Sequence, residues 1–453
     1  MYLLYEALFP QAGRFILPHC PDSDSAVSSP RLPSSLLIAL TGLLSLSIAM
    51  GIGRFAFTPV LPMMLHDGTL DLPTGSWLAT ANYIGYLLGA LLCAASPFWQ
   101  RYWRGAAWPP ARLVHTGLAA TVALTLAMAL PWPDAWPTWR FLSGIASAVV
   151  FVFTSGWVMA QLAQRQSTHL GSMIFAGPGA GIALSGLAVM GMVQQHWLAS
   201  SAWIAFGILA LLLTLAVWRT LDSPMPNAVC PPASLSASSP TESAAPSTPP
   251  TVPPEDNTGG TLEIGLLAVA YGLAGFGYII SATFLPVIAR TVLPPSPWLD
   301  MFWPIFGISV SVGALLATQA PRTLDNRLAL LVNYLLQAAG VLLSIFWQTL
   351  PGFVLSSILL GLPFTSITFF ALQEVRRLRP GQTASLLALI TALYGIGQIA
   401  GPPLAAALVE HTGDLARGFD LALGAAAATL LIGAGLYWLM FRRWPTTPKH
   451  PTP

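Results

Sequence analysis

The sequence is poor in charged residues. Only 8% of its 453 residues are Asp, Glu, Lys or Arg, against about 25% in an ordinary soluble domain. Hydrophobic residues make up 55% of the chain, and the formal net charge is only +2. This balance gives no basic surface for nucleic acid. A chain this apolar is expected to be embedded in a membrane.

Disulfide, metal and nucleotide patterns are missing as well. The three cysteines, Cys20, Cys93 and Cys230, have no metal-ligand spacing. The seven histidines fall mostly in expected loops and tails, without the clustered nucleophiles and acids that an enzyme needs. No glycine cluster follows a strand and opens a helix, as a phosphate-binding loop does. We therefore expect neither an enzyme nor a bound cofactor or metal.

A signal peptide is also absent from the sequence pattern. The start of the chain contains Glu6, Asp22 and Asp24, and it lacks a basic beginning, an apolar stretch and a small-residue cleavage site. We expect residues 1–33 to be a disordered cytoplasmic arm, or an upstream start that the functional protein does not use.

Long apolar runs dominate the rest of the chain. A helix needs about 20 apolar residues to cross a hydrocarbon core of roughly 30 Å. Twelve such runs lie near residues 35–64, 76–97, 112–132, 138–163, 171–194, 199–219, 262–288, 299–320, 327–348, 350–374, 383–409 and 418–441. The sequence therefore predicts an all-α integral membrane protein with twelve transmembrane helices.

A Pro/Ser-rich segment separates the sixth run from the seventh. Residues 222–260 cannot bury enough apolar surface to fold. We therefore expect a six-helix bundle at residues 34–221, a cytoplasmic linker at 222–260, a second six-helix bundle at 261–443 and a cytoplasmic tail at 444–453.

The basic residues indicate how the protein lies in the membrane. With both termini inside, fifteen of the 19 basic residues fall on the cytoplasmic side, Arg140, Arg290 and Arg417 fall on the other side, and Arg54 lies within the membrane. Positively charged loops stay in the cytoplasm. We expect a multi-pass protein of a bacterial inner membrane with both termini cytoplasmic.

The two halves of the sequence match at one constant offset, the offset that sets Gly51 over Gly275. The matches pair Gly51 and Gly53 with Gly275 and Gly277, Leu61-Pro62 with Leu285-Pro286, Gly89-Ala90-Leu91-Leu92 with Gly313-Ala314-Leu315-Leu316, and Gly177-Pro178 with Gly401-Pro402. Several matches in one register indicate a duplication. Parallel repeats of this kind are related by an axis along the membrane normal, and the substrate site lies between them.

The plan of twelve helices in two pseudo-symmetric bundles resembles the major facilitator superfamily (MFS) of secondary transporters. More narrowly, Gly-Ile-Gly-Arg-Phe at 51–55, followed by Trp-Leu-Ala-Thr-Ala-Asn-Tyr-Ile-Gly-Tyr-Leu-Leu-Gly at 77–89, is similar to the signature of the YbfB/YjiJ-type family. The resemblance covers about residues 35–442 without the linker. It implies the MFS fold and alternating access.

The sequence departs from the superfamily at its charged loop motif. Residues 97–104, after the second helix, keep basic residues but have no aspartate, and the counterpart after the eighth helix keeps only Asp325 and Arg327. Gating by a charge network at these loops is therefore not expected. Residues 177–181 resemble a loose form of the superfamily's antiporter motif, with Met173 where a glycine belongs, and this favours export.

Arg54 is the charge most deeply placed in an apolar stretch, residues 51–62. A guanidinium inside hydrocarbon costs from a few to more than about 10 kcal/mol, so it normally faces a wet cavity or a partner. We expect Arg54 to point into a watery chamber between the two bundles. The alternative is an arginine that extends to the outer interface, or pairs with a backbone carbonyl and only holds helices together.

Other polar residues recur at helical spacing and share helix faces. Asn82 and Tyr86 are four residues apart, Trp157 and Gln161 share a face with Thr154, Tyr394 and Gln398 share one with Thr391, and the repeat sets Tyr278 opposite Arg54. The predicted substrate-binding set is Arg54, Asn82, Tyr86, Trp157, Gln161, Tyr278, Tyr394 and Gln398. Such a cage suits a small organic anion, because arginine binds a carboxylate at two points. The alternative for each residue except Arg54 is a helix-to-helix hydrogen bond.

Prolines and acids complete the expected machinery. Pro59, Pro62, Pro178, Pro286 and Pro402 are expected to bend helices. If protons drive transport, Glu374 and Asp300 are the coupling candidates; otherwise the protein is a facilitator or an anion exchanger built on Arg54. Glu374 also suits an interfacial ion pair with Arg376, and Asp300 suits the start of a helix.

These features predict a monomeric secondary transporter, surrounded by membrane lipid, that moves a small organic solute. A channel or a lipid-handling membrane protein without alternating access is the alternative, because it would share the apolar spans but would not require two equivalent halves.

Overall fold

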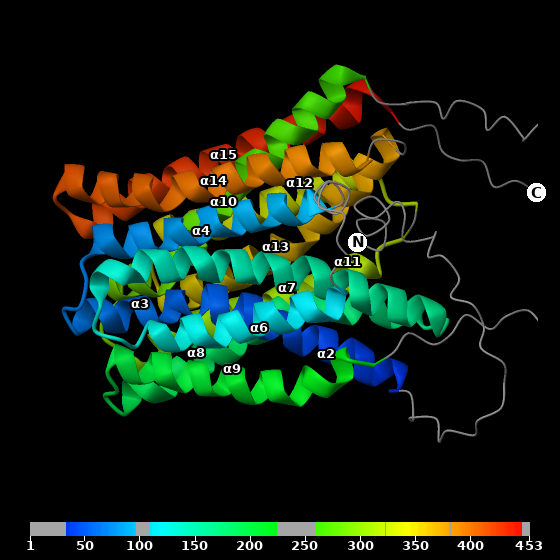
Figure 1. The fold of residues 1–453 in the computed structure, drawn as a ribbon. Coiled ribbons are helices and arrows are strands. Elements are labelled where there is room, and N and C mark those ends of the chain that lie inside the picture. Colours follow the sequence, from blue (N-terminus) through cyan, green and yellow to red (C-terminus); the bar gives the residue numbers. More distant parts are fainter. Residues whose placement is uncertain (1–32, 97–108, 224–259, 322, 380–382, 446–453) are drawn as a thin grey trace, which may run out of the picture.

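The computed structural model describes residues 33–96, 109–223, 260–321, 323–379 and 383–445 (Figure 1). These residues form helices joined by short connections and contain no strand. The all-α prediction is therefore confirmed. The predicted arm, most of the linker and most of the tail lie outside the described residues, and their bounds stay predictions.

The N-terminal bundle consists of α2 (Ser35–Leu46), the π-helix η1 (Ser47–Phe55), α3 (Phe57–His66), α4 (Leu72–Ala94), α6 (Pro110–Ala127), η2 (Pro133–Ala135), α7 (Trp136–Gln164), η3 (Thr168–Ala176), α8 (Gly177–Gln194) and α9 (Ala199–Leu221). The C-terminal bundle consists of α10 (Thr261–Val292), η4 (Pro297–Met301), α11 (Phe302–Thr318), α12 (Asn326–Phe346), α13 (Leu350–Leu378), α14 (Thr383–Thr412) and α15 (Leu415–Arg443). Because α2, η1 and α3 run on without a break, they form one span.

Eleven segments of the described chain are long and apolar enough to cross a membrane. The twelfth span is α6, which has 18 residues and packs between α7 and α9. Arg112 and His115 near its start make it less apolar than the others. Twelve spans agree with the sequence prediction.

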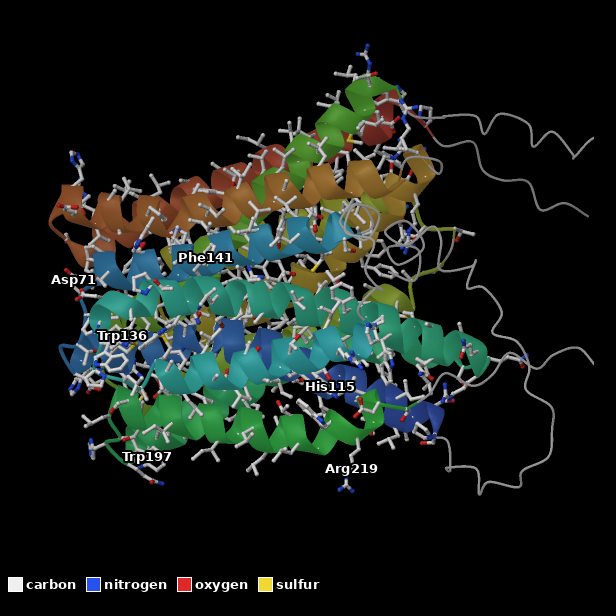
Figure 2. The ribbon with its side chains drawn as sticks, viewed as in Figure 1. Asp71, His115, Trp136, Phe141, Trp197 and Arg219 are labelled. Carbon is white, nitrogen blue, oxygen red and sulfur yellow. The ribbon has the colours of Figure 1, made fainter. Side chains whose placement is uncertain are left out.

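The spans run between two ends of the molecule. The start of α2, the end of α9, the start of α10 and the end of α15 lie at one end, on the right in Figure 1; we call it the linker end. Asp71, Trp197 and Trp136, the first residue of α7, lie at the opposite end (Figure 2). Both bundles therefore enter and leave on the same side, as two six-helix halves require.

The packing of the glycines agrees with a duplicated fold. We compared the glycines that the repeat pairs by asking which neighbouring helix a methyl group added at each one would contact. Gly51 faces α8 and Gly275 faces α14, Gly89 faces α7 and Gly313 faces α13, and Gly177 faces α2 and Gly401 faces α10. In each pair the two neighbours hold the same position in their bundles. The register that sets Gly51 over Gly275 therefore relates contacts as well as residue types.

The two bundles meet along two equivalent pairs of helices, α8 with α11 and α4 with α14. Between these pairs, Thr58 of α3 donates a hydrogen bond to the carbonyl oxygen of Ala282 of α10 at 2.8 Å. Thr58 and Ala282 occupy equivalent positions in the two repeats. Two equivalent positions can be in contact only where the symmetry axis passes between them. The pseudo-twofold axis therefore passes between Thr58 and Ala282.

Candidate substrate site at Arg54

Arg54 lies at the end of a π-helix inside the first span. Residues 47–55 form η1, and every one of them is buried. π-helical turns are rare, and they occur frequently at functional sites. Pro59 follows in α3, and because proline has no N–H it cannot donate to the carbonyl one turn before it. The ordinary ladder of backbone hydrogen bonds is therefore interrupted near Arg54.

Helix α7 supplies donors to this interrupted backbone. Arg140, Ser143 and Ser147 lie at helical spacing on one face of α7. Ser147 Oγ donates to the carbonyl of Ala49 at 2.7 Å, Ser143 Oγ to that of Gly53 at 2.8 Å, and the Nη1 and Nη2 of Arg140 to those of Gly53 and Arg54, each at 3.1 Å. This face of α7 fixes the end of η1 and with it the backbone of Arg54.

The sequence analysis only counted Arg140 among the basic residues on the side away from the cytoplasm and gave it no part in the site, whereas its side chain contacts η1. Its side chain is only 2% exposed, and its guanidinium carbon lies 4.7 Å from the centre of the Phe57 ring. Carbonyl oxygens of η1 accept hydrogen bonds from its guanidinium, so the residue points inward. A stripe of Arg140, Ser143 and Ser147 in an apolar span is the signal that could have revealed it.

The Arg54 side chain lies between the two bundles and is 3% exposed. Its Nη2 donates to Gln398 Oε1 of α14 at 3.0 Å. Its guanidinium carbon lies 4.0 Å from the centre of the Tyr86 ring, 5.1 Å from Phe55 and 5.2 Å from Tyr83. Cations are attracted to such ring faces. Contrary to the expected watery chamber, these groups cover Arg54, because the bundles are closed around it.

Aromatic side chains of the C-terminal bundle continue this site. Gln398 Nε2 donates to the Tyr278 hydroxyl oxygen. The Tyr394 ring stacks on Tyr278 at 5.7 Å and on Tyr271 at 4.7 Å, and the Phe364 ring meets Tyr278 edge-on at 4.9 Å. We call Arg54, Tyr83, Tyr86, Tyr278, Tyr394 and Gln398 the Arg54 cluster. It combines one cation and one amide with flat apolar walls.

Within the described part of the chain, no Asp or Glu forms an ion pair with Arg54. Its Nε has no hydrogen-bond partner there either. Uncompensated buried charges are rare in proteins, because taking a charge out of water is costly. The cluster thus holds a buried cation that no described acidic side chain neutralises.

The predicted substrate-binding residues separate into two groups. Tyr86, Tyr278, Tyr394 and Gln398 join Arg54 in the cluster. Asn82 lies nearby but belongs to the contact between α4 and α7, where its Nδ2 donates to the Arg140 carbonyl at 2.9 Å. Its Oδ1 has no partner among the described residues.

The structure does not bring Trp157 or Gln161 to the cluster. Trp157 comes after Arg140 on α7, and the two are separated by roughly 25 Å along the helix axis. Gln161 lies farther on, where its side chain accepts a hydrogen bond from Arg165 and donates to the Ser223 carbonyl at 3.4 Å. Both residues lie toward the linker end.

The prolines occupy several kinds of position. Pro178 is in the first turn of α8, directly after the 3₁₀ helix η3. Pro62, Pro286 and Pro402 lie inside α3, α10 and α14, and Pro403 follows Pro402. Of the predicted prolines, Pro59 follows the change from η1 to α3, and Pro178 follows the change from η3 to α8.

Glu374 lies in a buried charge network at the linker end of the C-terminal bundle. It pairs with Arg377 at 2.6 Å and with Arg327 at 3.8 Å, and Glu263 pairs with the same two arginines at 2.8 and 3.7 Å. Arg327 also pairs with Asp325 at 2.7 Å. Arg327, one of the two residues that remain of the charged loop motif, thus pairs with acids from the distant helices α10 and α13.

Asp300 lies at the other end of the C-terminal bundle, in η4, and pairs with Arg290. Its side chain is 9% exposed. Neither Asp300 nor Glu374 is in contact with the Arg54 cluster by any described ion pair or hydrogen bond. Each of these two acids is held by at least one arginine.

Two cavities open away from the cluster. One of about 610 Å³ lies at the opposite end and is lined by residues 68–71, Thr74, Pro133, Asp134, Trp136 and Pro137. There, a hydrogen bond with Thr74 keeps the pKa of Asp71 below its usual value. Another of about 400 Å³ lies beside His115 and Trp218, nearer the linker end (Figure 2).

A protein-family model described as "Uncharacterised MFS-type transporter YbfB" matches residues 46–437. The chain belongs to this family of major facilitator superfamily transporters. The resemblance inferred from the 51–55 and 77–89 stretches is thereby confirmed. No curated protein sequence is significantly similar to this transporter.

Solved structures show the same fold. A mutant of the nucleoside transporter NupG is 15% identical, with a TM-score of 0.63, and the match covers 90% of this chain and 100% of that chain. A bacterial homologue of the human lysosomal transporter Spinster, in an inward-facing and unoccupied conformation, is 13% identical, with a TM-score of 0.58 over 92% of this chain and 98% of that chain. The transporter therefore has the MFS fold of two six-helix bundles.

Proposed function

We propose that this transporter moves a small organic anion with a flat apolar part across the membrane by alternating access, with its carboxylate at Arg54. The observation that carries the proposal is the Arg54 guanidinium, which is buried between the bundles without an acidic partner among the described residues. Arginine recognises a carboxylate through two parallel N–H donors. A carboxylate would supply both the missing charge and the missing acceptors.

The walls of the cluster indicate the rest of the ligand. The Tyr86 ring presents its face to Arg54, and Tyr278, on which Tyr394 stacks, is joined to Arg54 through Gln398. Small-molecule sites are mostly apolar, with a few polar groups that fix orientation. A planar or ring-bearing carboxylate suits this combination better than a sugar, which would require several hydrogen-bond partners.

The cluster also links binding to movement. Arg54 and Tyr86 belong to the N-terminal bundle, whereas Tyr278, Tyr394 and Gln398 belong to the C-terminal bundle. A ligand that touches both sets stabilises the closed arrangement of the bundles. Rocking of the two bundles about a shared site is how parallel-repeat transporters expose it to each side in turn.

The remaining features of the proposal follow from the distribution of residues. The linker end is cytoplasmic in a bacterial inner membrane, because basic residues concentrate there, and the protein acts as a monomer. The glycine-rich start of α8 favours export. If protons are coupled, Glu374 and Asp300 act at the ends of the C-terminal bundle and not in the cluster.

The test is binding and transport of an aromatic carboxylate by purified protein in proteoliposomes. We expect benzoate or one of its ring-substituted analogues to bind and to be transported, and the neutral benzamide not to bind. Arg54→Ala should weaken binding by about 30-fold or more, since truncating one side of a buried charged pair costs about 2–5 kcal/mol.

Arg417→Ala is the matched control, because Arg417 is an exposed arginine at the start of α15. It should bind and transport like the wild type. Wild-type affinity for every tested carboxylate in a folded Arg54→Ala protein would assign Arg54 to helix packing and contradict the proposal.

A further inference from the structure

Gln398 joins the two bundles at the level of Arg54. Its side-chain oxygen accepts a hydrogen bond from Arg54 at 3.0 Å, and its amide nitrogen donates to the Tyr278 hydroxyl oxygen. The three side chains are at most 3% exposed. One neutral amide therefore links a cation of the N-terminal bundle to a phenol of the C-terminal bundle.

This hydrogen bond bears on what happens when an anion leaves Arg54. A buried guanidinium without an acceptor is costly, so a closing protein with an unpaired Arg54 would be disfavoured. An amide oxygen accepts hydrogen bonds as a carboxylate oxygen does, but it carries no charge. Because charge-assisted hydrogen bonds are stronger than neutral ones, an arriving carboxylate can displace Gln398.

The hydrogen bond belongs to an arrangement in which the bundles touch on both sides of it. Toward the opposite end, Thr58 donates to the Ala282 carbonyl at 2.8 Å, and the hydroxyls of Tyr83 and Thr283 lie 2.9 Å apart. Toward the linker end, Ser311 donates to the Ala176 carbonyl at 2.9 Å. Closure of the bundles and the contact between Arg54 and Gln398 are thus compatible.

We propose that Gln398 takes the place of the substrate carboxylate at Arg54 after the anion has been released. The closed arrangement can then form without a ligand, so the transporter returns empty. This inference rests on the proposed function and specifies its mode, which is net transport of an anion and not obligatory exchange of one anion for another.

Two substitutions of Gln398 distinguish the loss of an acceptor for Arg54 from the presence of a permanent negative charge beside it. Gln398→Leu removes the acceptor at similar side-chain size, whereas Gln398→Glu supplies a permanent carboxylate. The control is Gln337→Leu, because Gln337 is 1% exposed and its Nε2 donates to the Leu360 carbonyl at 3.4 Å within the C-terminal bundle. The control measures the loss of a buried glutamine away from the cluster.

The first experiment needs no transport. Spin labels are placed at Thr69 and Trp298, exposed residues at the opposite end of different bundles, in a variant without native cysteines. Without added anion, we expect one short distance for the wild type, Gln337→Leu and Gln398→Glu, and a shift to longer distances for Gln398→Leu. Benzoate should return Gln398→Leu to the short distance. An unchanged distance distribution in Gln398→Leu would overturn the proposal.

The second experiment compares two rates in proteoliposomes loaded with labelled benzoate: efflux into anion-free buffer and exchange against external benzoate. In Gln398→Leu the ratio of efflux to exchange should fall by about tenfold or more, because the closed state loses population only when the site is empty. An unchanged ratio, or a wild type that only exchanges, would overturn the inference. If the wild type neither binds nor transports benzoate, that substrate proposal fails while the spin-label comparison still decides the role of Gln398.

Discussion

Two buried arginines with different partners stand close to the centre of this transporter. The Arg140 side chain donates to backbone carbonyls of η1, which are fixed parts of the fold. The Arg54 side chain donates to a glutamine of the other bundle, and a side chain can move away. Arg140 therefore has the role of holding helices together, which the sequence left open for Arg54. For Arg54 we propose ligand recognition instead.

The Arg140 assignment predicts a loss of stability. Arg140→Met keeps much of the length of the side chain but removes its donors to the carbonyls of Gly53 and Arg54. The Gly53 carbonyl keeps its hydrogen bond from Ser143, whereas the Arg54 carbonyl loses the donor from Arg140, and an unsatisfied buried group costs about 1–3 kcal/mol. We expect a lower melting temperature by intrinsic tryptophan fluorescence in detergent. Arg140→Lys should recover part of the loss, because one ammonium can still donate to a carbonyl.

Arg417→Met is the matched control for this change, since Arg417 was expected on the same side of the membrane but is exposed. It should melt like the wild type. Equal melting temperatures for Arg140→Met and Arg417→Met would show that the contacts of Arg140 with η1 contribute nothing to stability.

At the scale of elements, close approach of helices depends on glycine. A methyl group added at Gly51 would lie closer than 3.0 Å to the main chain of Gly181 in α8. Small residues let membrane helices pack backbone to backbone. The first span can therefore approach α8 only while Gly51 lacks a side chain.

We expect Gly51→Ala to destabilise the protein by about 1–3 kcal/mol, as overpacking of a tight interface does. Gly265→Ala is the control, because nothing lies within 4 Å of a methyl group there, and it should be neutral or stabilise α10 slightly. Melting temperature and the yield of monodisperse protein measure both. A Gly51→Ala protein as stable as Gly265→Ala would contradict the close contact.

The sequence predicted the number of spans, their approximate bounds and the register of the repeat, because apolar length and repeated glycines are local signals. It could not predict η1, since the π-helix depends on donors from α7 that are distant in the sequence. Gln161 and Trp157 share a helix face with Thr154, but spacing on a face does not tell depth along the helix. The contacts of Arg140 with η1 and of Arg165 with Gln161 show how far apart the two ends of α7 lie, and they place Trp157 and Gln161 away from Arg54.

At the scale of the whole molecule, the contact of Thr58 with Ala282 predicts that the two bundles separate on the axis during transport. A double variant, Thr58→Cys with Ala282→Cys, in a protein whose Cys20, Cys93 and Cys230 are replaced, can be joined by a short bifunctional thiol reagent. Alternating access requires this contact to open, so we expect joining to abolish transport and reduction of a cleavable reagent to restore it.

The single variants, treated with the same reagent, control for modification alone and should transport normally. Transport at an undiminished rate in a fully joined double variant would mean that the bundles rock about this point without parting there.

The position of the axis has one more consequence, for stoichiometry. A duplicated chain ordinarily contains two equivalent copies of a binding site, but a site that lies on the symmetry axis between the repeats occurs only once. The repeat gives Arg54 the neutral Tyr278 as its counterpart, and the two meet through a single glutamine. The transporter thus has one charged position for the whole cluster, so saturation with a carboxylate would follow a simple hyperbola with one molecule bound per polypeptide.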